Sequence, residues 1–418
     1  MKDSGIEWIG EIPEGWEVGQ IGQLYSERRT KVSDKDYPPL SVTMKGILPQ
    51  LSTAAKTDAH DDRKLVCKGD FAINSRSDRR GSCGISEQDG SISLINTVLQ
   101  PRGEMNPGYY NWLFHTSMFA DEFYKWGHGI VDDLWTTSWS DMKKIGVPVP
   151  SKCEQKQIAE HLNFECSNID TILSRTRSSI EEYKKLKQAV ITQAVTKGVR
   201  GEREMKDSGN QWFGQIPTDW KLSRVGLHFS IILGKMLCNA PLNDTYTLEP
   251  YYCAADVHFD GVADGERKKM WFSPIEKDLY RVSVGDLLVV EGGAGAGGSA
   301  IVEKQDSYTY IQNSIMIVRS KGNTDNRYLR YLLEFLVKQG YIDVVCNKAT
   351  IPHFTKDKLS CVPFCLCGEQ EEIADYLDAK CAEIDKLIAK KEQLVKELEN
   401  YKKSLIFEYV TGKKELRR

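Results

Sequence analysis

The most regular alternation of apolar and polar positions lies in two segments, 154–196 and 369–411, neither of which contains proline or glycine. In the later segment the apolar stripe is formed by Leu377, Cys381, Ile384, Ile388, Lys391, Val395, Leu398, Lys402, Leu405 and Tyr409. In the earlier segment it is formed by Leu162, Cys166, Ile169, Leu173, Thr176, Ile180, Tyr183, Lys187, Val190 and Ala194. Steps that alternate between four and three residues are typical of a coiled-coil seam. We therefore predict one long helix in each segment, roughly 65 Å in length at about 1.5 Å per residue.

The two stripes correspond to each other at an offset of 215 positions. Both are interrupted by a polar residue at the same two steps, Thr176 and Lys187 in the first and Lys391 and Lys402 in the second. Two matching stripes of equal length favour helices that pair with each other, antiparallel if a two-fold axis crosses them. The alternative is that each helix packs only on its own globular domain, but such a helix would extend beyond a domain of ordinary size.

The rest of the chain is also written twice. The opening MKDSGIEWIGEIPEGW returns as MKDSGNQWFGQIPTDW at 205–220, and EQKQIAEHLNFECSNID at 154–170 returns as EQEEIADYLDAKCAEID at 369–385. The period of roughly 210 residues is far longer than that of a solenoid, so whole modules are duplicated. We expect a first globular domain over 1–150, a helix over 151–200, a second globular domain over 201–366 and a second helix over 367–418.

The globular segments show the mixed pattern of α/β (α+β) domains. Strands are expected at 37–47, 71–75, 91–101, 246–257, 285–292, 299–305 and 310–320, and helices at 107–126 and 326–340. A Gly-Asp turn precedes a strand in each copy, at Gly69-Asp70 and Gly285-Asp286, but the loops that follow differ. They read SRSDRRGSCG in the first copy and GGAGAGG in the second. Common frames with unlike loops suggest two related domains that recognise different targets.

Composition limits the possible partners. No apolar run approaches the roughly 20 residues that a membrane-spanning helix needs, and the acidic N-terminal segment lacks the basic start of a signal peptide. Eleven scattered cysteines are most simply reduced thiols in the cytoplasm. The net charge of −3 argues against a protein that holds nucleic acid by bulk electrostatics alone. Any DNA contact must use local basic residues or the phosphate contacts of partner subunits.

The glycines Gly293, Gly295 and Gly298 match the spacing of a dinucleotide-binding loop after a strand. A Rossmann site needs a helix next, with its N-terminus on the pyrophosphate. The sequence SAIVEKQ predicts another strand instead. A glycine-rich hairpin that can approach a ligand closely is the better interpretation.

The other chemical motifs give little support for ATPase activity, nuclease activity or zinc binding. The chain has no phosphate-binding G-x-x-x-x-G-K-[ST] loop, which excludes the usual ATPase signature. The triplet Glu266-Arg267-Lys268 has a form found in nucleases, yet no acidic strand residue precedes it as a partner. His353, Cys361, Cys365 and Cys367 could be drawn as zinc ligands, but they lack a C-x-x-C spacing, so core or linker thiols are favoured. No catalytic constellation is predicted.

Basic and small polar residues in the divergent loops are the candidates for DNA contact, because they can reach phosphates and base edges. In the first module they are Thr43, Lys45, Ser75, Arg76, Arg79, Arg80 and Ser82. In the second module they are Lys235, Arg267, Lys268, Lys269, Gly293, Gly295, Lys348 and Thr350, with Trp271 nearby. The alternative is that these are solvated loop residues with no role in DNA contact.

Taken together, these features resemble the DNA-specificity (S) subunits of type I restriction–modification systems. The resemblance rests on the IPEGW and IPTDW openings and on the Gly-Asp turns. It also rests on VPVPSKCEQKQIAEHL and VPFCLCGEQEEIADYL, which lead into the long helices, and on EYVTGK near the C-terminus. It covers essentially the whole chain. One departure is that Pro148 and Pro150 precede the first helix, whereas Pro363 is followed by Cys365 in the second copy.

The resemblance implies two target-recognition domains that each read one half of a split, asymmetric site in double-stranded DNA. Two conserved antiparallel helices would set the spacer between the halves. The chain would perform no chemistry and bind no cofactor, and partner subunits would use S-adenosylmethionine, ATP and Mg. Those partners would be two methyltransferase subunits and two restriction subunits, with no membrane involved. Methyltransferase contacts are implied at Glu154, Gln155, Ile158, Ala159, Glu369, Gln370, Ile373 and Ala374.

Two other classes of function remain as alternatives. A fused enzyme with its own methyltransferase would need the Asn/Asp-Pro-Pro-aromatic motif, and YPPL at 37–40 lacks the acidic or amide residue. A purely structural coiled-coil adaptor would show no sequence-selective DNA binding in its assembled complex.

Overall fold

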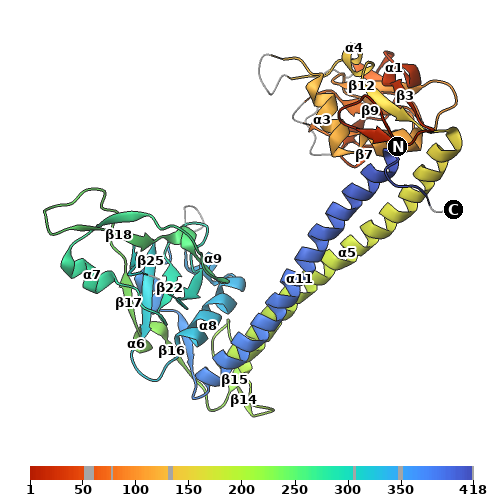
Figure 1. Ribbon diagram of the computed structural model, residues 1–418. Coiled ribbons are helices and arrows are strands. Elements are labelled where there is room, and N and C mark those ends of the chain that lie inside the picture. Colours follow the sequence, from red (N-terminus) through yellow and green to blue (C-terminus); the bar gives the residue numbers. More distant parts are fainter. Residues whose placement is uncertain (51–60, 77–78, 130–134, 305–306, 347–351, 417–418) are drawn as a thin grey trace. The chain divides into compact units, whose positions relative to one another are not determined.

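A computed structural model describes residues 1–50, 61–76, 79–129, 135–304, 307–346 and 352–416. The chain divides into two compact units (Figure 1): unit 1 comprises residues 1–177 and 392–418, and unit 2 comprises residues 178–391. The long helices α5 (Lys152–Lys197) and α11 (Gln370–Val410) each contribute to both units. The mixed α/β units and the two long helices agree with the predicted fold class.

The predicted stripe is the contact surface between α5 and α11 in each unit. All of its positions are buried or half-buried, while the residues on the outer faces of both helices are mostly exposed. In unit 1 the Lys402 ammonium lies 2.6 Å from an Asp170 carboxylate oxygen, and Arg177 pairs with Glu399. Because the partner's number falls as the number along α5 rises, the two helices run antiparallel there.

Unit 2 shows the same pairing with the roles of the helices exchanged. Lys187 of α5 lies 2.6 Å from Asp385 of α11, and these residues are the repeat equivalents of Lys402 and Asp170. The Lys391 ammonium lies 5.6 Å from the centre of the Tyr183 ring. The three lysines that interrupt the predicted seam therefore make contacts between the helices, whereas the Thr176 hydroxyl donates to the Ile172 carbonyl of its own helix at 2.8 Å. Burial of the seam thiols raises the pKa of Cys166 and of Cys381 to about 11.

The globular part of unit 1 contains short strands and helices in the following order. They are β1 (Lys2–Asp3), β2 (Glu11–Ile12), β3 (Glu17–Gln20), α1 (Ile21–Leu24), β4 (Tyr25–Glu27), β5 (Lys31–Val32), β6 (Leu40–Thr43), β7 (Gly46–Pro49), β8 (Arg63–Val66), β9 (Phe71–Asn74), β10 (Cys83–Ile85), β11 (Gly90–Ile92), β12 (Asn96–Pro101), α2 (Pro107–Phe114), α3 (Ser117–Lys125), α4 (Trp139–Met142) and β13 (Gly146–Val149). An antiparallel sheet of order β10-β9-β12-β4 forms the centre, beside a sheet of order β11-β8-β5 and the β6–β7 hairpin. Its core is aromatic and includes Tyr25, Phe71, Tyr109, Tyr110, Phe114 and Phe119.

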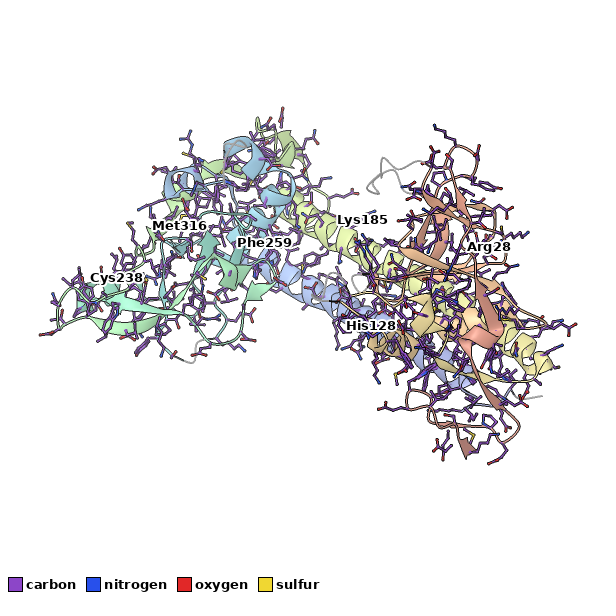
Figure 2. All side chains as sticks on the ribbon, turned by 90° about the horizontal axis from the view of Figure 1, so that it is seen from above. Arg28, His128, Lys185, Cys238, Phe259 and Met316 are labelled. Carbon is purple, nitrogen blue, oxygen red and sulfur yellow. The ribbon has the colours of Figure 1, made fainter. Side chains whose placement is uncertain are left out.

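The globular part of unit 2 repeats this plan with longer elements. They are β14 (Met205–Asp207), β15 (Gln215–Pro217), β16 (Lys221–Arg224), α6 (Val225–His228), β17 (Phe229–Leu233), β18 (Thr247–Tyr252), the 3₁₀-helix Ala254–Asp256, β19 (Val257–His258), β20 (Gly261–Val262), β21 (Lys269–Phe272), α7 (Pro274–Tyr280), β22 (Leu287–Val290), β23 (Ser299–Ile301), β24 (Tyr310–Ile311), β25 (Ile315–Ser320), α8 (Asn326–Lys338), α9 (Tyr341–Val345), α10 (Lys356–Ser360) and β26 (Pro363–Leu366). The main sheet has the order β17-β25-β22-β23, and α8 packs against its last three strands (Figure 1). Figure 2 shows Met316 inside this unit and Cys238 at its periphery.

The Gly-Asp turns of the two units have the same geometry, as the repeat predicts. Gly69 and Gly285 adopt φ values of 88° and 89°, a region that favours glycine. Asp70 and Asp286 each accept a 2.8 Å hydrogen bond from the backbone N–H three residues earlier. Each carboxylate also pairs with an arginine 2.6 Å away, Arg28 in unit 1 (labelled in Figure 2) and Arg319 in unit 2.

Some expected elements are divided by turns. The predicted helix over 107–126 is two helices, because Thr116 donates its hydroxyl to the Leu113 carbonyl and accepts from the Phe119 N–H, which starts α3. The predicted strand over 37–47 turns back at Met44 and Lys45 to form the β6–β7 hairpin. The local side-chain hydrogen bonds that create such turns compete with regular structure and leave little periodic signal.

Candidate nucleic-acid interface

In unit 1 the structure brings the two predicted DNA-contact segments together. Thr43 and Lys45 lie at the turn of the β6–β7 hairpin. Gly46, at that turn, lies against Gly84 of β10, so close that a Cβ on Gly84 would come within 2.7 Å of the Gly46 Cα. Since β10 directly follows the loop that holds Arg76, the hairpin and the arginine loop are neighbours.

The described residues of the arginine loop differ in what their side chains can do. Arg76 and Arg79 have exposed side chains. Arg80 pairs with Asp121 of α3 and lies 5.1 Å from the centre of the Tyr124 ring, and both partners of this ion pair are exposed. Ser75 and Ser82 are enclosed: the Ser75 hydroxyl lies 3.0 Å from that of Thr97, and Ser82 is buried.

In unit 2 two of the predicted DNA-contact residues have structural partners. Lys235 donates to Glu276 at 2.5 Å and to the Trp271 carbonyl at 2.9 Å. Arg267 pairs with Asp256 at 3.0 Å and lies 4.8 Å from the centre of the Tyr252 ring. Neither side chain has a free charge for a phosphate. The exposed cations of this segment are Lys268 and Lys269, where β21 begins.

The Lys235 contact also affects the charge of its acidic partner. Burial would raise the pKa of Glu276, but hydrogen bonds from Lys235 and Ser273 outweigh that effect and lower the pKa. Glu276 therefore stays ionised at neutral pH and keeps the lysine in place.

The glycine-rich segment joins two antiparallel strands, β22 and β23, as predicted, and no helix follows it. Gly293 has a φ of 88° and its N–H donates to the Pro352 carbonyl at 3.2 Å. Gly295 lies in the same turn. Lys348 and Thr350 lie outside the described residues. The geometry is that of a hairpin loop and lacks the helix N-terminus that a dinucleotide pyrophosphate needs.

The histidine and cysteines considered as zinc ligands do not gather into a metal site within the described ranges. Among the described residues, no cluster of three or more His, Cys, Asp or Glu side chains could hold a metal ion. His353 lies 3.3 Å from Glu291, and Cys365 is buried with its pKa raised by that burial. No helix in the described ranges is both long and apolar enough to cross a membrane.

The repeated tryptophan and the repeated Glu-Gln pair form one contact, which we call the joint. In unit 1 the joint consists of Trp16, which donates to Glu154 at 3.1 Å, and Gln155, which accepts from the Asn106 N–H at 2.9 Å. In unit 2 Trp220 donates to Glu369 at 2.9 Å, and Gln370 accepts from the Asp325 N–H at 3.1 Å. Each joint ties its long helix to the opening segment and to the N-terminus of a domain helix.

The joints account for the residues implied as methyltransferase contacts. Gln155, Ile158, Ala159, Glu369, Gln370, Ile373 and Ala374 are all buried, and Glu154 is half-buried. Burial would raise the pKa of Glu154, but hydrogen bonds from Ser151 and Trp16 outweigh it and lower the pKa. These eight residues hold each domain on its helix and form no open docking surface within their units.

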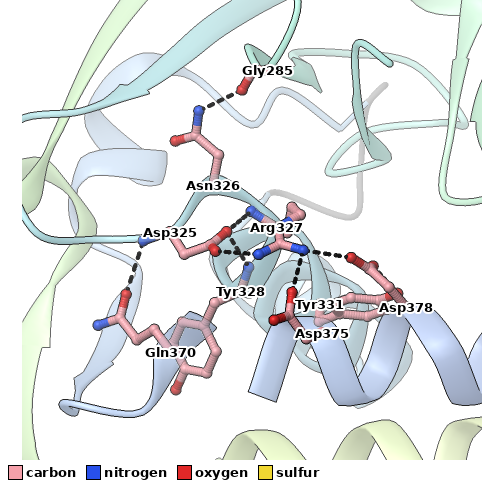
Figure 3. Close-up of polar contacts among 9 residues, drawn as sticks. All are labelled: Gly285, Asp325, Asn326, Arg327, Tyr328, Tyr331, Gln370, Asp375 and Asp378. Atoms are coloured by element: carbon pink, nitrogen blue, oxygen red, sulfur yellow. Dashed lines mark hydrogen bonds and ion pairs between the residues drawn. The ribbon is translucent and has the colours of Figure 1, made fainter. Parts of the chain in front are cut away.

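The joint of unit 2 carries an additional ionic network, drawn in Figure 3. Arg327 donates to Asp325 at 2.9 Å, to Asp375 at 2.7 Å and to Asp378 at 2.9 Å, and the Tyr331 hydroxyl donates to Asp378 at 2.7 Å. Its three carboxylate partners raise the pKa of Arg327 against the opposing effect of burial. The guanidinium therefore connects α8 to α11 at two successive turns.

The equivalent place in unit 1 has no arginine. Gly108 stands two residues after the N-cap Asn106, as Arg327 stands two residues after the N-cap Asp325. The remaining link is a hydrogen bond from Trp112 to Asn163 at 2.9 Å, and Asn163 is the repeat equivalent of Asp378. The two units thus use the same joint with different charge.

A second duplicated feature lies on the outside of the long helices and was not predicted. Ile172 and Leu387 are repeat equivalents, as are Leu186 and Tyr401, and all four side chains are exposed. The Lys402–Asp170 and Lys187–Asp385 pairs place Tyr401 level with Ile172 and Leu186 level with Leu387. We call Ile172 with Tyr401 in unit 1, and Leu186 with Leu387 in unit 2, the outer apolar pairs. Their signal in the sequence was apolar character in both copies at positions outside the seam.

The joints generate a prediction about local stability. Glu369→Ala would leave Arg203 and the buried Trp220 N–H without their acceptor, since Arg203 lies 2.7 Å from Glu369. We expect the change to destabilise the joint by about 3 kcal/mol, the range for a buried pair that loses one partner. Glu154→Ala should cost about 1 kcal/mol, because it loses hydrogen bonds in a less buried place. Hydrogen exchange of residues 198–204 and of the first turns of α5 and α11 measures both values.

Glu372→Ala is the matched control, because Glu372 is exposed and its ion pair among the described residues is with the exposed Arg200. It should leave exchange at the joint nearly unchanged. Equal protection in the Glu369→Ala variant and the wild type would contradict the assigned role of the joint.

Comparisons with known proteins agree with this geometry. No model of a protein family matches the chain. The chain is 25% identical over 434 residues to a protein of Methanocaldococcus jannaschii named as a type I restriction enzyme MjaX specificity subunit, covering 97% of this chain and 95% of that protein. It is 26% identical over 237 residues to the MjaVIII specificity subunit of the same organism, covering 54% of this chain and 51% of that one.

Two solved structures share the fold. One is from a study of complex assembly and conformational transition of the type I R-M system, with a TM-score of 0.73 and 14% identity over 96% of this chain and 98% of that chain. The other is the HsdS subunit from Thermoanaerobacter tengcongensis, with a TM-score of 0.57 and 16% identity over the same shares. The chain is thus similar along nearly its whole length to the specificity subunits of type I restriction enzymes, which confirms the resemblance seen in its sequence.

Proposed function

We propose that this chain is the DNA-specificity subunit of a type I restriction–modification complex, and that each unit reads one half of a bipartite, asymmetric site. The observation that carries the proposal is the duplicated joint. The same tryptophan, glutamate and glutamine contacts mount two domains whose surface loops differ in sequence and charge. An asymmetric two-part site requires two recognition domains that differ in their loops and are attached to their helices in the same way.

The candidate reading surfaces differ in chemistry. Unit 1 offers Lys45 and Arg76 on a hairpin and a neighbouring loop, while unit 2 offers Lys268, Lys269 and the glycine-rich hairpin. Basic side chains on such loops contact phosphates and guanine edges, and a glycine backbone allows close approach to the duplex. With a net charge of −3, the chain would rely on partner subunits for much of the phosphate contact.

The paired helices would set the spacer between the half-sites. α5 and α11 pack antiparallel in unit 1 and again in unit 2, with Lys–Asp pairs that fix their register in both places. Half-sites about one helical turn apart on DNA suit a protein with two-fold repeated readers. The chain would contribute positioning and sequence reading but no catalytic group.

The chemistry would belong to partner subunits. Two methyltransferase subunits would use S-adenosylmethionine, and two restriction subunits would use ATP and Mg, while this chain would bind no cofactor in the cytoplasm. We place the methyltransferase contacts on the outer apolar pairs, because the residues first implied are enclosed in the joints. One outer apolar pair in each unit matches two copies of the same partner.

The first test is DNA binding with and without the methyltransferase subunit. Because the chain is acidic overall, we expect the lone chain to bind DNA weakly and to distinguish its site poorly from other sequences. The assembled complex should prefer its site by a factor of about 10³ or more. Gel shifts at fixed salt measure both, and tight, sequence-specific binding by the lone chain would contradict the shared contribution.

A second test concerns the docking surface. Lysine at an outer apolar position would bury an unpaired charge in the interface, so Ile172→Lys and Leu387→Lys should each weaken one methyltransferase site about 100-fold. Native mass spectrometry should show two bound subunits for the wild type, one for each variant and none for the double variant. Leu394→Lys is the control, because Leu394 is also exposed but its repeat equivalent is Ser179. Full binding by the double variant would rule out these sites.

A third test concerns the spacer. Four residues inserted after Arg175 and four after Leu398, positions at about the same level along the antiparallel helices, would lengthen both helices by about 6 Å, close to one turn. The methylated site in cells should then gain about two base pairs between its halves, at 3.4 Å per base pair. Both half-sequences should stay the same and serve as internal controls. An unchanged spacer with normal methylation would show that these helices do not measure the distance.

A further inference from the structure

The β6–β7 hairpin of unit 1 presents a methionine at its tip. The hairpin reverses at Met44 and Lys45, between the paired residues Thr43 and Gly46. The Thr43 hydroxyl donates to the Gly46 carbonyl at 2.9 Å and accepts from the Lys45 N–H at 3.1 Å, so the turn is held by side-chain hydrogen bonds. Met44 is 71% exposed, more than any other large apolar side chain described in unit 1.

The base of the hairpin is anchored, which leaves the tip projecting from a fixed support. Val42 and Ile47 pack against the small buried cluster that contains Leu40 and Val66. A Cβ on Gly84 would come within 2.7 Å of the Gly46 Cα and 3.3 Å of the Ile47 nitrogen, so the hairpin backbone rests directly on β10. A glycine at 84 is therefore needed for this position of the tip.

Cations lie beside the methionine in the turn and on the neighbouring loop. Lys45 follows it in the turn, and the loop before β10 carries the exposed Arg76. An exposed apolar side chain near cations is poorly suited to a protein interior or a lipid tail, but it matches the chemistry of a duplex. Phosphates take the cations, and the major groove, about 12 Å wide, admits a two-stranded ribbon. The apolar group that a base pair presents there is the C5-methyl of thymine.

We propose that Met44 is a specificity-determining residue that packs on a thymine methyl group in the half-site read by unit 1, with Gly84 as the residue that positions it. The inference rests on the proposed function and adds a residue and a base to it. A thioether has no hydrogen-bond donor and its sulfur is only a weak acceptor, so its selectivity comes from the methyl contact. The first half-site must therefore contain a T·A pair that unit 1 reads through this methyl group.

The test uses the assembled complex and a set of duplexes in which each thymine of the site is replaced, one at a time, by deoxyuridine. Deoxyuridine removes the C5-methyl and leaves the base-pairing edge unchanged. The wild-type complex should lose about fourfold in affinity at one position in one half-site, the value of a single buried methyl. Met44→Ala should bind the unmodified site more weakly and show no further loss at that deoxyuridine.

Three further variants distinguish a direct contact of Met44 with DNA from an effect of the hairpin position or of misfolding. Met236→Ala changes an equally exposed methionine in unit 2 (75%) and should keep the deoxyuridine effect. Gly84→Ala should reduce the effect by displacing the hairpin, whereas Gly15→Ala, where a Cβ meets no atom within 4 Å, should not. Unchanged discrimination at the other half-site shows that each variant complex is assembled and folded.

The outcomes distinguish this inference from the function on which it rests. A wild-type complex that is site-specific but indifferent to every deoxyuridine would overturn it, as would a Met44→Ala complex that keeps the full effect. A first half-site without thymine in either strand would do the same. Complexes that bind all sequences equally would instead refute the proposed function.

Discussion

The structure depends on one contact that is made twice, partly buried in unit 1 and buried in unit 2. A tryptophan from the opening segment donates to a glutamate at the start of a long helix, and the next residue, a glutamine, holds the N-terminus of a domain helix. An indole N–H and a carboxylate enclosed together are stable only when paired, so the contact fixes how each domain sits on its own helix. Because the joint fixes each domain on its helix, the sequences of the surface loops can diverge while the fold is kept. That freedom is the physical basis for two readers of different sequence.

A small number of polar side chains sets the register in which α5 and α11 pack against each other. Their seam is mostly apolar, which gives attraction but little choice of register. Lys187 and Lys402 interrupt it at equivalent positions and find Asp385 and Asp170, each in the opposite helix. A shift of one heptad would separate both pairs. The duplicated units therefore share a register as well as a joint, and the ionic network around Arg327 adds links between α8 and α11 in unit 2.

Periodic features were predictable from the sequence, and contacts between distant residues were not. The seam, the repeat and the Gly-Asp turns follow from spacing and identity within each segment, and the structure confirms them. The partner of Lys235 is Glu276, 41 positions away, and no local sequence pattern predicts this contact. The resemblance implied that the Glu-Gln pair contacts a partner subunit, and its burial in the joints was not foreseen, because a motif shows that residues matter without showing what they pack against. The outer apolar pairs were detectable by comparing the two copies.

We infer that two domains with different loops, each held by the same joint, recognise two different half-sites. Sequencing of methylated adenines in cells that express this chain with its cognate methyltransferase tests it most directly. The account predicts a single motif with two different specified halves, separated by a fixed run of unspecified bases. A continuous motif, a palindrome or methylation without sequence preference would contradict it.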